Sequence, residues 1–379
     1  MHLDHLERLI LAAGGSERQL TEITKELGLD AVALVLANEI AFRASIRPHA
    51  SESLVALDVH HSGAIATFVF TVGSTVTVSP GSTDDVAMRL EYELHDLVRL
   101  IFGPSRPRAT GTFAATFLPP YAGGTALPDP MSVLSSLQAN GTVMSGLSQH
   151  HPDLGDLART HLTDKWGGVH WFADVYEQHL RPYRDLPVRV LEIGIGGYGH
   201  PAQGGEGMRV WKRYFHRGLV IGADIYDKSG VDEQRMITVV ADQSSPDALI
   251  AIDEQYGPFD IIIDDGSHVN SHVRTSFETL FPRLRSGGLY VIEDLYTSFW
   301  PGYGGNPAAG PTTSVGLVQS LVEGLQHEER PGFAPGYFER HVTGVHAYHN
   351  LAFVEKGVNL EGGVPSWVPR EPLGSDAHW

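Results

Sequence analysis

Cysteine is absent from the 379-residue sequence, which excludes a disulfide framework, a thiolate zinc site and a cysteine nucleophile. No apolar run approaches the roughly 18 to 20 residues that a membrane-spanning helix needs. The N-terminal segment Met1–Arg8 is polar and charged, so we do not expect a secretory signal there. These absences predict a cytoplasmic protein that has no membrane partner.

Basic residues are scarce relative to acidic ones. Lysine and arginine total 27 against 45 aspartates and glutamates, and the formal net charge is −18. A negative field of this size repels phosphate backbones, so a nucleic-acid partner is not expected, whereas a neutral or cationic small molecule is tolerated. The hydrophobic fraction of 42% is ordinary for a protein that buries a core, and the length allows two domains.

The N-terminal part begins with a helical pattern and continues with β-type runs. Apolar residues have helical spacing from Leu6 to Ile46, with a break at Gly14-Gly15 after which Ser16 can cap a second helix. Strands are then predicted at Leu54–Val59, Ala64–Val72 and Thr75–Val78.

The segment Asp84–Phe102 is expected to be a helix, because Gly103-Pro104 ends its apolar pattern. The segment Phe117–Pro130 is rich in glycine and proline and resembles a linker. We therefore predict an α+β auxiliary domain over residues 1–150 and a second domain over residues 151–379.

From Val188 onward, short apolar strands alternate with helical segments. The predicted strands are Arg189–Ile193, Leu219–Asp224, Met236–Ala241, Phe259–Asp264 and Gly288–Ile292. This alternation predicts an α/β fold with a doubly wound, mostly parallel sheet and crossover helices. Two later runs, Thr343–His346 and Leu351–Lys356, are only a few residues apart and predict an antiparallel C-terminal hairpin on that sheet.

The first strand of this sheet runs into a glycine-rich turn. Gly194, Gly196 and Gly199 match the spacing of the dinucleotide fingerprint, which a dehydrogenase would share. Glu192 directly before the turn favours a cationic ligand instead, and the loop His200–Gly207 does not begin a helix at once, as a pyrophosphate site requires. A turn with a purely structural role is the remaining alternative.

Polar residues also end the next two strands. Asp224 is placed to accept hydrogen bonds from both hydroxyls of a ribose, or else it caps a helix. Asp242 and Gln243 follow the third strand, where they suit recognition of an adenine edge or, alternatively, cap a loop. These residues extend the predicted ligand site along the carboxyl ends of the strands.

Acidic residues gather where the fourth and fifth strands end. Adjacent parallel strands end at one edge, so Asp264, Asp265, Glu293 and Asp294 come within reach of one point. Crowded carboxylates repel one another and need a cation or protons, and oxygen ligands favour Mg²⁺, Mn²⁺ or Ca²⁺ over zinc. We predict that Asp265, Glu293 and Asp294 bind a hard divalent cation. Asp264 is not assigned to the cation and is expected to contact the ligand bound beside it. Some of these acids can instead cap the helices that follow.

His268 is the predicted general base. It follows Gly266-Ser267 and is expected to open the next helix, whose N-terminus disfavours the imidazolium form and leaves a neutral proton acceptor. A nearby metal lowers the pKa of a hydroxyl, and such a histidine can then take its proton. His268 and His272 also have the spacing of two zinc ligands on one helix face, although the glutamate of H-E-x-x-H is absent.

The glycine-turn sequence Val190–Gly199, together with Asp224, Asp242 and the closing hairpin, resembles the class I S-adenosylmethionine methyltransferases. The resemblance covers residues 188–356. It implies that Glu192 lies near the methionine amino group of the cofactor, that the turn from Gly194 to Tyr198 lies under the methionine portion, and that Asp224 binds the ribose.

The acidic cluster narrows the resemblance. The run Asp264–His268 with Glu293-Asp294 is similar to the metal-dependent sugar O-methyltransferases of antibiotic biosynthesis, in particular to the mycinamicin VI 2″-O-methyltransferase group. This implies S-adenosylmethionine and Mg²⁺ as cofactors and His268 as the base. It also implies methyl transfer to a sugar hydroxyl of a glycosylated macrolide or polyketide.

The resemblance extends upstream to the segment Thr163-Asp164-Lys165, where related enzymes often build a lid, and Lys165 is assigned to the cofactor carboxylate. A homo-oligomer is expected, a tetramer by resemblance. Alternatives are a methyltransferase that acts on a catechol or another vicinal diol, a related cofactor-assisted hydroxylase, and a non-enzymatic assembly protein.

Overall fold

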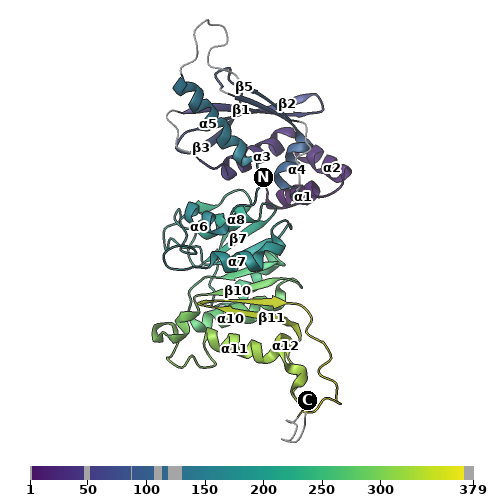
Figure 1. Cartoon of the computed structure of the whole chain (residues 1–379), viewed down its shortest axis with the longest axis vertical. Helices are drawn as coiled ribbons and strands as arrows, with labels where there is room; N and C mark the ends of the chain where they lie inside the picture. The colour runs from purple at the N-terminus through teal and green to yellow at the C-terminus, as the bar shows by residue number, and fades with distance from the viewer. Residues whose placement is uncertain (1, 47–51, 87, 106–112, 118–129, 371–379) are drawn as a thin grey trace, which may run out of the picture. The chain divides into compact units, whose positions relative to one another are not determined.

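The structure is a computed structural model and describes residues 2–46, 52–86, 88–105, 113–117 and 130–370 (Figure 1). The chain forms two compact units. The first comprises Met1–Val188, Glu206–Val220 and Asp232–Ile237, and the second comprises Arg189–Gly205, Ile221–Val231 and Thr238–Trp379. These units are defined by packing, so the functional boundary between residues 150 and 151 stays a prediction.

Three helices open the first unit, and a local sequence signal explains where the second begins. They are α1 (Leu3–Ala13), α2 (Glu17–Leu27) and α3 (Leu29–Arg43). The backbone N–H of Ser16 donates to the Gln19 side chain at 2.9 Å, and the Ser16 hydroxyl accepts from the Gln19 N–H, which is a capping box. The predicted break before Ser16 and its capping role are confirmed.

A five-stranded sheet follows, in the order β3-β2-β1-β4-β5. Its strands are β1 (Ser53–His61), β2 (Ala64–Val72), β3 (Val76–Pro80), β4 (Met88–Glu93) and β5 (Phe113–Phe117). The β1–β4 pair is parallel and the other neighbours are antiparallel. Helices α3, α4 (Leu94–Phe102) and α5 (Pro130–Gly146) pack against these strands, so the α+β expectation is confirmed (Figure 1).

The predicted helix over Asp84–Phe102 is wrong in its first part, where β4 pairs with β1. Met88, Leu90 and Tyr92 are buried and alternate with partly exposed residues. A period of two fits a strand with one buried face, and only the residues of α4 have the helical period. The segment predicted as a linker, residues 117–130, lies outside the described residues apart from its two ends.

A seven-stranded sheet has the order β11-β12-β10-β9-β6-β7-β8. Its strands are β6 (Arg189–Ile193), β7 (Leu219–Asp224), β8 (Met236–Val240), β9 (Ile261–Asp264), β10 (Leu289–Glu293), β11 (Val342–Tyr348) and β12 (Leu351–Lys356). The central strand β9 pairs in parallel with β6 and β10, whereas β12 is antiparallel to both β10 and β11. The predicted doubly wound, mostly parallel sheet with an antiparallel hairpin is confirmed.

Helices precede and connect these strands. They are α6 (Leu154–His161), α7 (Ala173–Leu180) and α8 (Glu206–Tyr214) in the first unit, and α9 (Pro246–Tyr256), α10 (Asn270–Leu280), α11 (Ser314–Leu325) and α12 (Tyr337–His341) in the second. In the second unit α11 packs against the edge strand β11, and α10 contacts both α9 and α11. None of the helices in the described part of the chain has the length and hydropathy that crossing a membrane requires.

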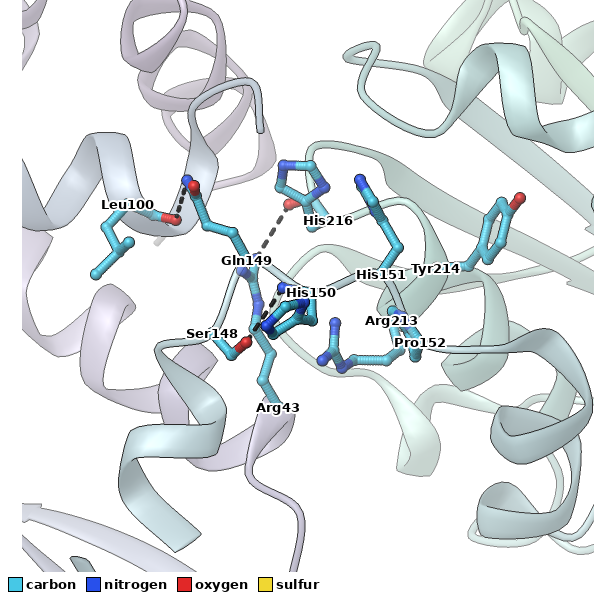
Figure 2. A pocket seen from close by; sticks show the side chains of 10 residues that line it. All are labelled: Arg43, Leu100, Ser148, Gln149, His150, His151, Pro152, Arg213, Tyr214 and His216. Carbon is cyan, nitrogen blue, oxygen red and sulfur yellow. Dashed lines mark hydrogen bonds between the residues drawn. The ribbon is translucent and has the colours of Figure 1, made fainter. Parts of the chain in front are cut away.

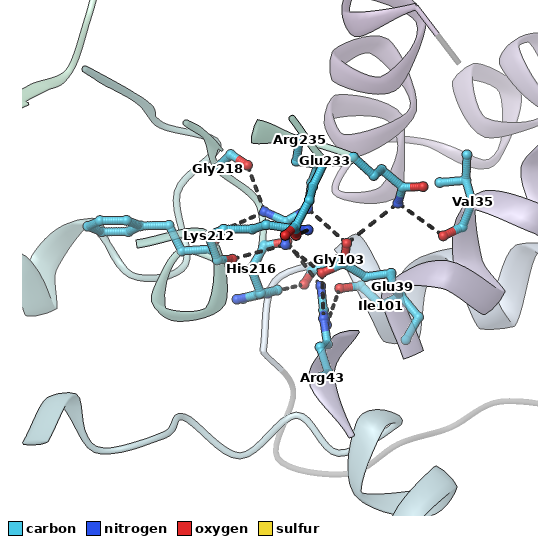
Figure 3. Close-up of polar contacts among 12 residues, drawn as sticks. Val35, Glu39, Arg43, Ile101, Gly103, Lys212, His216, Gly218, Glu233 and Arg235 are labelled. Carbon is cyan, nitrogen blue, oxygen red and sulfur yellow. Dashed lines mark hydrogen bonds and ion pairs between the residues drawn. The ribbon is translucent and has the colours of Figure 1, made fainter. Parts of the chain in front are cut away.

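A buried network of charged side chains holds α3 in the first unit (Figure 3). Glu39 of α3 accepts hydrogen bonds on both carboxylate oxygens from Arg235, and Arg43 donates to one of them at 2.9 Å. Lys212 pairs with Glu233 beside them at 2.7 Å. Glu39, Arg43, Lys212 and Arg235 are all at most 5% exposed, so these charges depend on one another rather than on water.

Candidate active site

The glycine turn after β6 is tightly enclosed on one side and open on the other. Gly194 has φ +91°, and a Cβ there would collide with the backbone carbonyl of Asp265. Gly196 has φ +77°, and the space that a side chain would take there is empty. Only glycine tolerates both the positive φ and the close approach. The turn therefore offers bare backbone to a ligand directly beside Asp265.

Asp224 closes this turn from the end of β7. Its Oδ2 accepts from the Ile195 N–H at 3.0 Å, and its Oδ1 accepts from the Tyr226 N–H at 2.9 Å. The next helical turn begins only at Ser229, so Asp224 does not cap a helix. Each carboxylate oxygen keeps a further lone pair, and the side chain is partly exposed, which suits a hydroxyl-bearing ligand.

Lys228 holds the loop that follows the turn, and sequence reasoning missed it. Its ammonium is buried and donates to the carbonyls of His200 at 3.1 Å and Gln203 at 3.2 Å. No motif marks this lysine, because its partners are backbone carbonyls of a loop whose path the sequence does not reveal. Lys228 thereby supports the wall of the glycine turn.

Gln243 and Asp264 form a brace beneath the site. The Gln243 amide donates to Asp264 Oδ1 at 2.6 Å and accepts from the Ser267 N–H at 2.9 Å. Ser276 and Tyr290 both donate to Asp264 Oδ2. Burial raises the pKa of Asp264 to about 6 against the lowering effect of these donors. Both side chains thus fix the loop after β9, and their predicted contacts with the cofactor stay predictions.

The remaining residues predicted to bind the cofactor lie in different environments. Glu192 is buried in β6, and Tyr198 in the turn is 86% exposed. Asp242 is exposed and accepts from both the N–H and the hydroxyl of Ser244, which is the loop-capping arrangement. Lys165 belongs to the first unit, where it is buried with its ammonium 6.0 Å from the Trp211 ring centroid. Their roles toward the cofactor stay predictions.

The structure brings Asp265, His268 and Asp294 together at the carboxyl edge of the sheet. Each offers a ligand atom, and these atoms lie within 4.8 Å of one another. His268 Nε2 is 3.5 Å from Asp294 Oδ2. Two carboxylates beside an imidazole form a donor set that fits a hard divalent cation next to a proton acceptor. Glu293, the last residue of β10, is buried nearby, but it is not part of this group among the described residues.

The prediction that His268 opens a helix is wrong. Helix α10 begins at Asn270 with Val269 as its N-cap, and His268 precedes it with φ +55°. Asp294 also has a positive φ of +58°. Left-handed backbone at residues other than glycine is costly and persists where the surroundings enforce it, commonly at functional sites. Local backbone conformation, rather than a helix terminus, therefore directs this imidazole toward Asp294.

An apolar cavity of about 670 Å³ lies beside the acidic cluster. Its wall combines the turn after β10, helix α11 and the β11–β12 turn. The lining residues are Leu295, Tyr296, Phe299, Val315, Val318, Gln319, Val322, Glu323, Ala347, Tyr348, His349 and Asn350. The volume is in the range of cavities that hold drug-sized molecules. Tyr296 also donates from its hydroxyl to Asp294 Oδ2 at 3.1 Å, so cavity and cluster adjoin.

A second histidine cluster in the first unit has a different explanation. His151, Asp185 and His216 offer atoms at metal-ligand spacing. The Ser105 hydroxyl already bridges His151 and Asp185, at 3.1 and 2.7 Å, and His216 bonds the Gly103 carbonyl at 3.0 Å. The adjoining pocket measures about 10 Å³, room for one water molecule, and Figure 2 shows two arginines in its lining. These hydrogen bonds account for the cluster without an ion.

Comparison with known proteins gives concordant matches. A family model described as "MycE methyltransferase N-terminal" matches residues 6–113. The demethylmacrocin O-methyltransferase of Streptomyces fradiae is 51% identical over 374 residues, which cover 97% of this chain and 94% of that protein. The mycinamicin VI 2″-O-methyltransferase of Micromonospora griseorubida is 41% identical, with coverage of 97% and 94%.

A solved structure is similar over nearly the whole chain. It is the MycE methyltransferase from the mycinamycin biosynthetic pathway in complex with Mg, SAH and mycinamycin VI. The TM-score is 0.91 at 41% sequence identity, and the match covers 98% of this chain and 97% of that chain. Similarity at this level shows that the two chains share a fold.

Proposed function

The chain belongs to the S-adenosylmethionine-dependent sugar O-methyltransferases of macrolide and polyketide biosynthesis, and from this premise we propose its reaction. It transfers the methyl group of S-adenosylmethionine to a sugar hydroxyl of a glycosylated macrolide or polyketide, with Mg²⁺ as metal cofactor. One observation carries the proposal: the glycine turn at Gly194 abuts Asp265, which belongs to the same cluster as His268 and Asp294.

The donor set fits a magnesium ion. Asp265 and Asp294 would hold it, with Glu293 of β10 as the further predicted ligand. When bound, the ion supplies positive charge that lowers the pKa of an acceptor hydroxyl and orients a vicinal pair of hydroxyls. Its charge would offset the repulsion between the neighbouring carboxylates of Asp265 and Asp294.

His268 performs the proton transfer. Its Nε2 takes the proton from the sugar hydroxyl. At the same time the hydroxyl oxygen forms a bond to the methyl carbon, and the bond between that carbon and the sulfur of S-adenosylmethionine breaks. The products are a methyl ether and S-adenosylhomocysteine, and His268 later releases the proton to solvent. Asp294 Oδ2, 3.5 Å from Nε2, stabilises the imidazolium that forms. Orientation of donor and acceptor by the turn and the cluster supplies much of the remaining rate acceleration.

The apolar cavity indicates what kind of methyl acceptor the protein binds. We assign it to the aglycone, because Tyr296 and Asn350 belong both to the cavity wall and to the surroundings of Asp294. Its apolar side chains, Phe299 and Val322 among them, suit a ring of hydrocarbon character better than a small catechol. The predicted homo-oligomer and cytoplasmic location stay predictions.

Methyl transfer from labelled S-adenosylmethionine tests the proposal. We expect label in the sugar of a glycosylated macrolide, no label in catechol, loss of transfer in EDTA and recovery on addition of Mg²⁺. The matching aglycone without its sugar is the control, and it should stay unlabelled. Preferential labelling of catechol would overturn the sugar assignment, and full activity in the chelator would overturn the metal assignment.

Replacement of Gly194 by alanine is expected to weaken S-adenosylhomocysteine binding by at least about tenfold. A residue with a Cβ costs about 1 to 2 kcal/mol at this positive φ and collides with the Asp265 carbonyl, so the turn must shift away from the conformation assigned to cofactor binding. Isothermal titration calorimetry measures the loss. The control is Gly302→Ala, because nothing lies within 4 Å of a Cβ there. Equal affinity in the two variants would contradict the assignment of the turn to the cofactor.

A further inference from the structure

We propose that Asn350 and Tyr296 are positioning residues that clamp the carboxylate of Asp294 in the geometry that metal binding requires. The inference rests on the proposed metal-dependent function and adds residues to it. Asn350 lies 56 positions beyond Asp294, and no sequence motif connects it with the acidic cluster. The proposal is carried by contacts on both sides of one carboxylate.

Each oxygen of Asp294 has its own donor. The Tyr296 hydroxyl donates to Oδ2 at 3.1 Å, and the Asn350 amide donates to Oδ1 at 3.4 Å. Neither donor carries a charge, so the carboxylate keeps its negative charge for a cation while its plane is held. A lysine or arginine in the same place would neutralise the ligand instead.

Asn350 also holds the backbone that carries Asp294. Its side-chain oxygen accepts from the Tyr296 N–H at 2.7 Å, and its carbonyl accepts from the Leu295 N–H at 3.3 Å. These bonds fasten the two residues that follow Asp294. Because Asp294 has a left-handed φ of +58°, its conformation needs such external support.

The sheet topology explains how Asn350 reaches this position. Strand β12 lies antiparallel beside β10, and Leu351 at its start pairs with Glu293 at the end of β10. The turn before Leu351 is thereby delivered to the carboxyl edge of the sheet. Asn350 is buried there with φ +72°, a conformation that asparagine tolerates better than most residues. The appended hairpin thus contributes to the active site as well as to the sheet.

Asn350→Gly removes the clamp without imposing backbone strain, because glycine accepts a positive φ. We expect Mn²⁺ binding to the full-length protein, measured by electron paramagnetic resonance, to weaken by about 10- to 100-fold, as loss of outer contacts to metal ligands typically does. Tyr296→Phe keeps the ring and removes one donor, so a loss of several-fold is expected. Affinity for S-adenosylhomocysteine should stay at the wild-type value in both variants.

Asn359→Ala is the matched control. The Asn359 amide donates to the carbonyls of Leu325 at 3.2 Å and Glu339 at 2.9 Å, so it is an asparagine bonded within the same unit but outside the cluster. Its loss should lower the melting temperature and leave Mn²⁺ affinity unchanged. A purely structural role for Asn350 would give the same result as this control.

The outcomes separate the clamp from the proposed function. Wild-type Mn²⁺ affinity in Asn350→Gly overturns the clamp, and if that variant does not fold, wild-type affinity in Tyr296→Phe overturns it. Weaker Mn²⁺ binding with unchanged S-adenosylhomocysteine affinity supports the clamp. A higher Mg²⁺ concentration needed for half-maximal activity, without a higher KM for S-adenosylmethionine, supports it further. Failure of the wild-type protein to bind Mn²⁺ at all contradicts the metal site itself, and the clamp falls with it.

Discussion

Replacement of His268 by asparagine is expected to lower kcat by about 10²- to 10⁴-fold and to leave the affinity for S-adenosylhomocysteine unchanged. Asparagine tolerates the left-handed backbone that His268 adopts at φ +55°, so the variant keeps the loop and loses the proton acceptor. The reaction then requires the hydroxyl proton to leave to water. Single-turnover transfer of a labelled methyl group measures the chemical step directly.

His272→Ala is the control for this experiment. His272 lies in α10 and bonds the Ser267 hydroxyl through Nδ1 at 2.9 Å, but it is outside the cluster formed by Asp265, His268 and Asp294. We expect nearly wild-type turnover. If His272→Ala were as inactive as His268→Asn, the two histidines would act as a pair, and the base assignment would give way to the zinc interpretation of their spacing. Unchanged turnover in His268→Asn would exclude the base assignment outright.

Replacement of Glu39 by glutamine is expected to destabilise the protein by about 3 to 5 kcal/mol. The change leaves the guanidinium groups of Arg43 and Arg235 buried without the carboxylate that both of them contact (Figure 3). Removing one partner of a buried ion pair is strongly destabilising, because the remaining charge is buried away from water and has no partner. Replacing the whole pair by apolar side chains costs much less. Urea denaturation monitored by circular dichroism measures the difference.

Glu22→Gln is the matched control, because Glu22 pairs with Arg18 on the exposed face of α2. That substitution should change stability by no more than about 1 kcal/mol. Similar losses in the two variants would show that burial does not decide the strength of the Glu39 network.

The pH dependence of the Glu39 effect has a definite sign. Burial by itself raises the pKa of Glu39, but the charges of Arg235 and Arg43 outweigh it and hold that pKa well below its usual value. A carboxyl with a depressed folded-state pKa contributes stability above its unfolded-state pKa of about 4.3, and the contribution is lost as the pH falls from there toward the folded-state pKa. The stability difference between the wild type and Glu39→Gln should therefore be largest near neutral pH and shrink in acid.

Much of the catalytic unit could be predicted because its signals are local. Strands such as Arg189–Ile193 and Leu219–Asp224 are short apolar runs, since a parallel sheet is buried on both faces. Their carboxyl ends meet at one edge, so the sequence predicts that Asp265, Glu293, Asp294 and His268 lie at one site, and the structure groups Asp265, His268 and Asp294 there. The cap at Ser16 could also be predicted, because its partner Gln19 is only three residues away.

Predictions failed where a local pattern admitted two structures. The segment Met88–Glu93 has apolar residues that suit either a strand or the start of a helix, and pairing with β1 decided for the strand. The left-handed backbone of His268 could not be predicted either, because a histidine in the sequence does not indicate a positive φ as a glycine does.

The sequence by itself determined the fold class, the glycine turn and most of the acidic cluster, because each depends on short apolar runs, on the residues that directly follow them, or on the convergence of parallel strand ends. Only the tertiary structure decided what holds these parts in place. Asn350 and Asp294 meet because β12 inserts antiparallel beside β10, and Glu39 meets Arg235 across 196 positions. Such contacts depend on where packing brings distant segments together, and no periodicity along the chain encodes them.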